Sequence, residues 1–127
     1  MYIKRDMEKL VTELSSEYPA ILITGPRQVG KTTMLQKLME GTGRAYVTLD
    51  DLNARQLAKT DPELFLQTYG TPILIDEVQY APELFTYIKI MVDKNHTPGE
   101  FWLTGSQAFK LMQGIQESLA GRVAALN

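Results

Sequence analysis

The chain has 127 residues, of which 44% are hydrophobic and 22% are charged, and its formal net charge at pH 7 is −2. These values indicate one globular domain, and they exclude a disordered chain and the long-range attraction of a basic protein for nucleic acid. The lack of cysteine excludes disulfides, thiolate metal sites and cysteine nucleophiles. The sequence has no apolar run of membrane-spanning length and no signal-peptide core near its start, so we expect a cytoplasmic protein with no membrane partner.

The first part of the chain alternates between helical and strand patterns. Apolar residues recur at helical spacing over residues 6–18, where Asp6 can act as the N-cap. Residues 20–24 form a short, branched apolar run, which is typical of a strand buried on both faces. We then expect a helix over residues 32–40 and a strand over residues 45–49.

The alternation continues after a further helical stretch. Asp61 and Pro62 supply an N-cap and a first helical residue for a short helix, and residues 73–77 predict the third strand. A helix that begins at Pro82 and a strand over residues 101–104 follow. The last expected elements are one or two short helices, with core candidates Phe109, Leu111, Met112, Ile115 and Leu119, and a fifth strand over residues 122–126. Strands that alternate with helices predict a mostly parallel sheet in a three-layer α/β fold.

The segment GPRQVGKT, residues 25–32, has the spacing of a phosphate-binding loop. Gly25 and Gly30 allow backbone N–H groups to line a concave anion site, which lies at the positive end of the following helix. Lys31 can bind the β- and γ-phosphates, and the Thr32 hydroxyl can ligate Mg²⁺. An ordinary glycine-containing turn is the alternative, and the strand before and helix after the segment disfavour it. The predicted nucleotide-binding residues are Gly25, Pro26, Arg27, Gln28, Val29, Gly30, Lys31, Thr32 and Thr33.

Polar residues also end the third and fourth expected strands, and in an open parallel sheet such ends converge on the ligand. Asp76 with Thr32 suits a Mg²⁺ ion that bridges two phosphates. Glu77 can orient an attacking water, a task that a phosphotransferase does not need. Ser106 and Thr104 can bond the same water or the γ-phosphate, or can cap the next turn, and for Thr104 we expect turn capping.

Four segments, ITGPRQVGKTT, ILIDEVQ, LTGS and LAGR, occur in this order and span nearly the whole chain. Together they resemble the AAA-type branch of P-loop ATPases, and more closely the bacterial and archaeal ATPases whose N-terminal AAA module carries these motifs. The resemblance implies the strand order 5-1-4-3-2 and implies ATP and Mg²⁺ as cofactors. It also implies that Lys31 binds phosphate, that Thr32 and Asp76 bind Mg²⁺, that Glu77 acts on water and that Ser106 senses the γ-phosphate.

Arg122 has two interpretations. The resemblance suggests a catalytic arginine that stabilises transition-state charge, in cis or from a neighbouring molecule, but an arginine at the start of a strand equally suits a surface ion pair. Members of the family continue into a C-terminal domain, and AAA proteins carry a helical lid. We therefore expect residues 1–127 to be a truncated ATPase module that lacks both and has weak activity alone.

The favoured function is Mg²⁺-dependent ATP hydrolysis that powers or gates an unknown protein partner or C-terminal domain. A nucleotide-gated switch with little turnover is the alternative. A small-molecule kinase is less favoured, because Glu77 would have no role and the region after Phe109 has no arginine-rich lid. The preference for ATP over GTP rests on the resemblance, and this module shows no signal for nucleic-acid binding.

Overall fold

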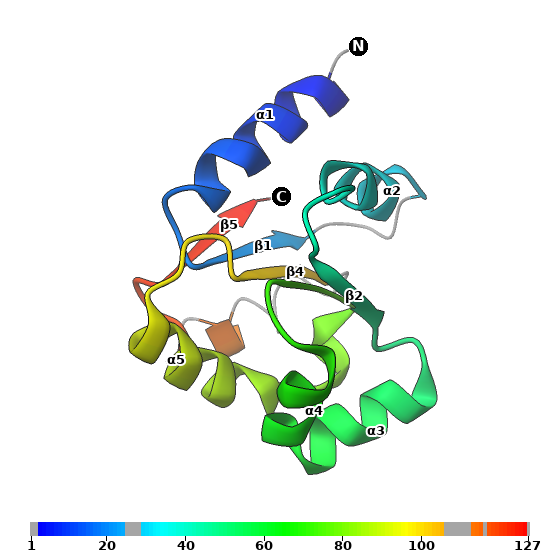
Figure 1. Cartoon of the computed structure of the whole chain (residues 1–127), viewed down its shortest axis with the longest axis vertical. Coiled ribbons are helices and arrows are strands. Elements are labelled where there is room, and N and C mark those ends of the chain that lie inside the picture. Colours follow the sequence, from blue (N-terminus) through cyan, green and yellow to red (C-terminus); the bar gives the residue numbers. More distant parts are fainter. Residues whose placement is uncertain (1–2, 25–28, 106–112, 116, 127) are drawn as a thin grey trace.

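The computed structural model describes residues 3–24, 29–105, 113–115 and 117–126 (Figure 1). Its five strands form a single sheet in the order β2-β3-β4-β1-β5, and each neighbouring pair is parallel. The strands are β1 (Ala20–Thr24), β2 (Ala45–Thr48), β3 (Ile73–Asp76), β4 (Phe101–Gly105) and β5 (Val123–Leu126). Read from the opposite edge, this is the expected order 5-1-4-3-2, so the predicted α/β class and strand order are confirmed.

The three central strands are short apolar segments that are buried along their whole length. Parallel strands of this kind are covered by helices on both faces, which explains why their sequences do not alternate between apolar and polar residues. The ends of the strands differ from prediction by one residue at most. The largest consequence is at Glu77, which leaves β3 because its backbone is left-handed, with φ 60° and ψ 49°.

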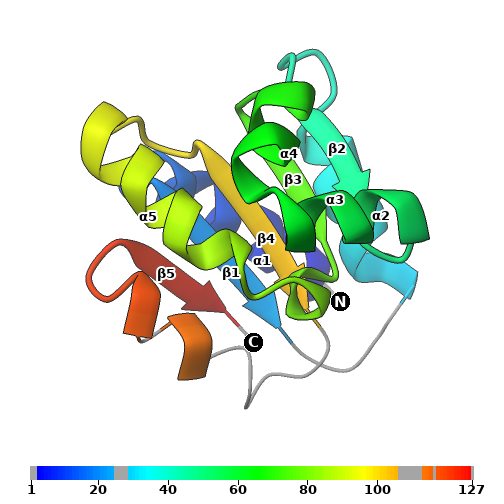
Figure 2. The same cartoon turned by 90° about the horizontal axis from the view of Figure 1, so that it is seen from below.

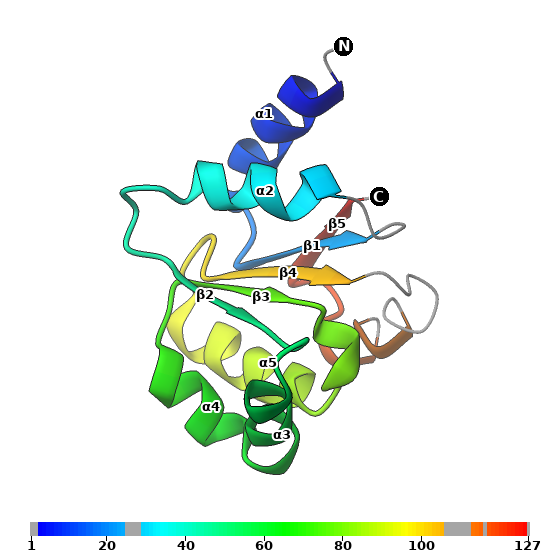
Figure 3. The same ribbon diagram turned by 90° about the vertical axis from the view of Figure 1, so that its right-hand side faces the viewer.

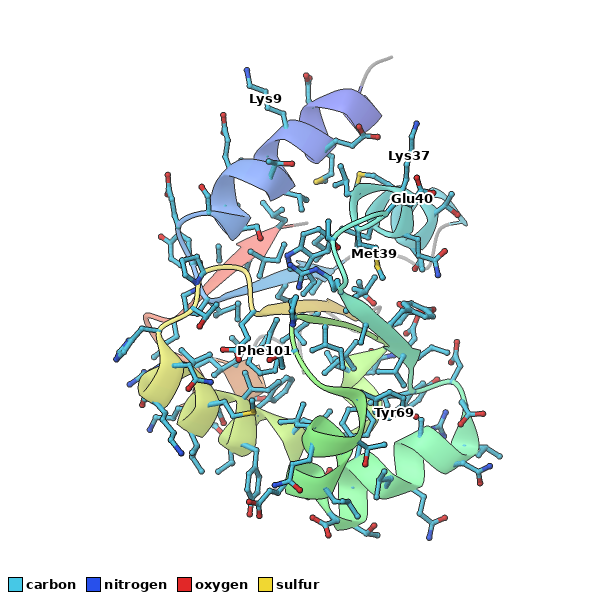
Figure 4. All side chains as sticks on the ribbon, in the orientation of Figure 1. Lys9, Lys37, Met39, Glu40, Tyr69 and Phe101 are labelled. Atoms are coloured by element: carbon cyan, nitrogen blue, oxygen red, sulfur yellow. The ribbon has the colours of Figure 1, made fainter. Side chains whose placement is uncertain are left out.

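Helices cover both faces of the sheet and give the expected three layers (Figure 3). The helices α1 (Ile3–Ser15) and α2 (Val29–Leu38) lie on one face, where Val11, Met34 and Leu35 pack against the sheet. On the other face lie α3 (Leu52–Thr60), α4 (Pro62–Tyr69), α5 (Leu84–Asn95) and the short 3₁₀ helix η1 (Val78–Tyr80), around a larger core. Figure 4 shows Phe101 within this second core, Lys9 and Lys37 at the exposed surface of α1 and α2, and Glu40 in the exposed turn after α2.

The helix starts show where local sequence rules held. Asp61 caps α4 by accepting a hydrogen bond from the Leu64 N–H at 3.1 Å, with Pro62 as the first helical residue, as predicted. Asp6 is not an N-cap, because α1 already includes Ile3, and Asp6 instead lies in the first turn, where the helix dipole favours an acidic residue. The helix predicted to begin at Pro82 starts two residues later, because Pro82 lies in a turn before α5.

The C-terminal part of the chain contributes two of the expected core residues. Ile115 and Leu119 are buried against the same core as α5, while Phe109, Leu111 and Met112 lie outside the described residues. Residues 113–115 and 117–118 are helical, in agreement with the expected short helices. Among the described helices, none combines the length and the apolar character that a membrane span requires.

Candidate functional site

The carboxyl ends of the parallel strands define one edge of the sheet. The arrows of β1, β4 and β5 point toward this edge in Figure 2. Thr24 ends β1 there, and its hydroxyl donates to the Leu126 carbonyl oxygen at 3.3 Å. The predicted phosphate-binding loop follows Thr24 directly, so the loop is attached at the same edge as Asp76 and Thr104.

The helix after the loop begins at Val29, three residues earlier than predicted, so Gly30, Lys31 and Thr32 lie in its first turn. The first-turn N–H groups of an α-helix have no partner within the helix, and they carry the positive end of its dipole. The second half of the predicted loop therefore presents backbone donors of the kind that bind phosphate. The predicted loop residues Gly25, Pro26, Arg27 and Gln28, and the side chain of Lys31, lie outside the part that the structure describes.

Asp76 receives hydrogen bonds from three different elements of the fold. Its Oδ1 accepts from the Thr32 hydroxyl of α2 at 3.4 Å and from the Thr104 hydroxyl of β4, and its Oδ2 accepts from the Tyr46 hydroxyl of β2 at 3.4 Å. Asp76 is only 7% exposed. It shares the face of Leu74, because residues two apart in a strand point the same way, and this face is the one that α2 covers. The structure therefore brings together the predicted pair Thr32 and Asp76.

Tyr46 was not identified as a site residue from the sequence, because it stands within a predicted strand and belongs to no motif. Burial, together with the negative charge of Asp76, raises the pKa of Tyr46 above its ordinary value. The phenol thus keeps its proton and acts as a donor to the Asp76 carboxylate. Its place next to β3 follows from the strand order, which was the signal that could have identified it.

From the sequence, Thr104 was expected only to cap the next turn. In the structure it connects β4 to both acids. Its hydroxyl donates to Asp76 and accepts from the Glu77 N–H at 3.1 Å. The residue is 1% exposed, so this bridge is made inside the protein. Ser106, the other predicted polar residue of this strand end, lies outside the described residues, and Thr33 is exposed on α2.

Glu77 joins Asp76 because of its backbone conformation. Consecutive residues of a strand point to opposite faces, which would separate two adjacent acids. The left-handed conformation of Glu77 reverses this, and carboxylate oxygens of Asp50, Asp76 and Glu77 all lie within 4.8 Å of one another. Glu77 is 8% exposed, and its Oε1 accepts from Gln79 Nε2 at 2.7 Å. Asp50 and Gln79 were not predicted as site residues, although Asp50 directly follows the strand predicted over residues 45–49.

The oxygen atoms at this edge fit a divalent cation. Carboxylates and a hydroxyl are the donors that Mg²⁺ prefers, and two oxygens on adjacent positions of its coordination shell lie about 3.0 Å apart. The 3.4 Å between Thr32 Oγ1 and Asp76 Oδ1 is close to this spacing. The residues that could hold the ion are thus Thr32 and Asp76, with Asp50 and Glu77 near enough to bind its water ligands.

Arg122 lies near the amino ends of the strands, opposite to the carboxyl ends that carry the site. It precedes Val123, which pairs with Ala20 at the start of β1, far from the strand ends that carry the site. Its guanidinium forms a two-pronged ion pair with Asp93, with Nη2 3.2 Å from Oδ2, and this pairing lowers the pKa of Asp93. Of the two interpretations of Arg122, the geometry matches the surface ion pair and opposes a catalytic role in cis.

The parallel sheet, the helix that begins within the loop motif and the strand-end acids define the P-loop NTPase fold. Solved structures share it at low sequence identity. The Walker-type ATPase paby2304 of Pyrococcus abyssi superposes with a TM-score of 0.68 at 16% identity, over 99% of this chain and 53% of that one. The P-loop NTPase domain of a sigma-54 transport activator from E. coli gives 0.60 at 14% identity, over 96% and 92% of the two chains.

The family follows from the sequence match. The profile of the family described as "AAA domain" matches residues 17–127, so the chain belongs to this family, as the motifs predicted. It is 37% identical over 123 residues to the uncharacterized protein Mb2031c of Mycobacterium bovis and, with the same figures, to the uncharacterized protein Rv2008c of Mycobacterium tuberculosis. The match covers 94% of this chain and 27% of each relative, so the chain spans about a quarter of their length.

Proposed function

We propose that this domain binds ATP together with Mg²⁺ and hydrolyses it, and that hydrolysis powers or gates a protein partner or a C-terminal domain. The observation that carries the proposal is the contact of Thr32, from the loop helix, with Asp76 at 3.4 Å, beside a second buried carboxylate at Glu77. A hydroxyl from α2 and two acids from the end of β3 meet where the first turn of α2 presents backbone donors for phosphate.

The binding roles follow from the chemistry of each residue. The first-turn N–H groups of α2 and the Lys31 ammonium would hold the phosphates, and Thr32 and Asp76 would hold the metal. When bound, Mg²⁺ neutralises charge that develops on the phosphate oxygens. Tyr46 and Thr104 keep the Asp76 carboxylate oriented by donating to its oxygens.

Glu77 is the proposed acceptor for the proton of the attacking water, and it would orient that water toward the γ-phosphate. It is a second acid beside the metal-binding acid, which is what a hydrolase needs and a phosphotransferase does not. Ser106 would bond the γ-phosphate from the end of β4. Arg122 would contribute only to the site of a neighbouring molecule. The site of the same molecule lies at the carboxyl ends of the strands, whereas Arg122 lies near their amino ends.

A nucleotide-gated switch with little turnover is the second candidate. It is favoured by the position of Arg122, which pairs with Asp93 near the start of β1 and not with the site of its own molecule. The two functions differ in the ratio of two rates. A switch releases and exchanges nucleotide faster than it hydrolyses it, whereas an ATPase hydrolyses ATP in each cycle of binding. Single-turnover phosphate release, measured beside the exchange of a fluorescent ATP analogue, separates them.

Lys31→Ala tests the phosphate site itself. The change removes a charge-assisted contact of about 1.5–3 kcal/mol, so we expect the Kd for ATP to rise roughly 10- to 150-fold. Isothermal titration calorimetry with ATP and Mg²⁺ measures this, and Lys37→Ala on the exposed side of the same helix is the control. Equal affinity of Lys31→Ala and wild type would overturn the assignment of the loop.

A further inference from the structure

Gln79 contacts Glu77, the proposed catalytic acid, and the proposed function gives Gln79 no role. It lies in η1, two residues after Glu77, and its Nε2 donates to Glu77 Oε1 at 2.7 Å. This distance is at the short end for an N–H···O bond, as expected when the acceptor is charged. The bond therefore links a neutral amide to the carboxylate that is proposed to act on water.

The surroundings of Glu77 explain why such a donor is needed. Carboxylate oxygens of Asp50 and Asp76 lie within 4.8 Å of that of Glu77, and like charges repel at this separation, more strongly where burial lowers the effective dielectric constant. A further charged side chain at this position would alter the charge of the site. An amide N–H binds the carboxylate without adding charge.

The backbone around Glu77 is fixed by other contacts. Its N–H donates to the Thr104 hydroxyl at 3.1 Å, and its carbonyl accepts from the Tyr80 N–H at 3.3 Å. These two bonds hold the left-handed conformation that brings the residue to the site. These backbone bonds do not act on the side chain, whereas the bond from Gln79 restricts the side-chain torsions.

Gln79 is itself anchored through the next residue. The guanidinium of Arg55 stacks 3.8 Å from the centre of the Tyr80 ring, and Arg55 Nε donates to the Leu49 carbonyl at 2.9 Å. The Leu49 N–H in turn donates to the Asp76 carbonyl at 2.9 Å. The short helix η1 is thus tied to the ends of β2 and β3, so its amide is held in a defined place relative to the site.

We propose that Gln79 is the positioning residue for Glu77, and that its amide N–H holds the carboxylate in the orientation that accepts a proton from the attacking water. The inference rests on the proposed function, since it assumes that Glu77 acts on water. A displacement of about 1 Å at a reacting group costs up to about 100-fold in rate. Loss of this bond should therefore lower kcat and leave ATP binding intact.

The test compares Gln79→Ala with Gln79→Glu, which keeps the size of the side chain but has no N–H donor when ionised. Gln67→Glu makes the same chemical change on the exposed side of α4 and is the control. We expect both Gln79 variants to lose about 10- to 100-fold in kcat for Mg²⁺-dependent ATP hydrolysis. The Kd for a fluorescent ATP analogue and the melting temperature of Gln79→Ala should stay close to those of the wild type. Gln79→Glu adds a negative charge beside three acids, so its melting temperature should fall. Gln67→Glu should change none of these.

Two further measurements separate positioning from a structural role. In a Glu77→Gln background, Gln79→Ala should cause no additional loss of the residual turnover, because residues that act through one another are not additive. The side-chain amide signals of Gln79 in a ¹⁵N NMR spectrum, assigned from their loss in Gln79→Ala, should move in Glu77→Gln. Equal additional losses in both backgrounds, or amide signals that do not move, would overturn the proposal.

The outcomes also distinguish this inference from the function on which it rests. If the wild type hydrolyses ATP and Gln79→Ala has an unchanged kcat, the positioning role is wrong while the proposed function stands. If the wild type binds ATP without turnover, the proposed function is wrong, and the role of Gln79 in catalysis is wrong with it.

Discussion

Thr104→Val is expected to lower the free energy of unfolding, because it removes the hydroxyl that bonds both Asp76 and Glu77. Valine has nearly the same shape as threonine, so the change creates no cavity and removes only the hydroxyl, in a residue that is 1% exposed. The Glu77 N–H, which donates to this hydroxyl at 3.1 Å, loses its acceptor, and an unsatisfied buried amide costs about 1–3 kcal/mol. Asp76 loses one donor but keeps those from Thr32 and Tyr46, which limits its share to about 1 kcal/mol.

The expected decrease in the free energy of unfolding is therefore about 2–4 kcal/mol, a large part of the total stability of a small domain. Urea unfolding can be followed by the fluorescence of Trp102, the single tryptophan, which is 6% exposed and lies on the same strand. Thr86→Val on the exposed side of α5 is the control and should stay within about 0.5 kcal/mol of the wild type. A Thr104→Val variant as stable as this control would refute the bridging role.

Two more predictions concern pH. The raised pKa of Tyr46 means that folding favours the protonated phenol, so its contribution to stability is present below the ordinary tyrosine pKa of about 10 and is lost as the pH rises through the raised value. In ultraviolet titration the wild type should show a late-titrating tyrosine that Tyr46→Phe lacks, and identical late phases would contradict this. The lowered pKa of Asp93, caused chiefly by its hydrogen bond from Arg122, has the opposite sign, with stability present above about pH 4 and lost as the pH falls through the lowered value. The melting temperature of Asp93→Asn should thus lie slightly below that of the wild type at neutral pH and low salt, and the difference should disappear in acid; a difference that is independent of pH would exclude the ion pair as its cause.

Local patterns in the sequence predicted the elements of the fold well. The branched run of β1, the N-cap of α4 at Asp61 and the position of Asp76 at the end of β3 depend on neighbours in the chain, and each is confirmed. The start of α1 was predicted too late, because Asp6 suits both an N-cap and a first-turn position. The strand order came from the family resemblance, since periodicity contains no information on which strands are neighbours.

The details of the site were harder to predict because they depend on contacts between distant segments. Thr104 meets Asp76 across 28 residues, and Tyr46 meets it across 30, so neither bond leaves a local pattern. The left-handed conformation of Glu77 could not be read from its sequence, because glutamate rarely adopts it. The ion pair of Arg122 with Asp93 also joins residues 29 apart in the chain, and the motif that contains Arg122 could not predict it.

The central claim is that Glu77 serves hydrolysis and not binding. Steady-state phosphate release from ATP, measured with Mg²⁺ for the wild type and for Glu77→Gln beside the Kd for ATP of each, tests it directly. We predict that Glu77→Gln keeps the affinity for ATP and loses about 10²- to 10⁴-fold in turnover, as expected when a proton acceptor is removed. Equal turnover of the two proteins, with Mg²⁺ present, would contradict the account.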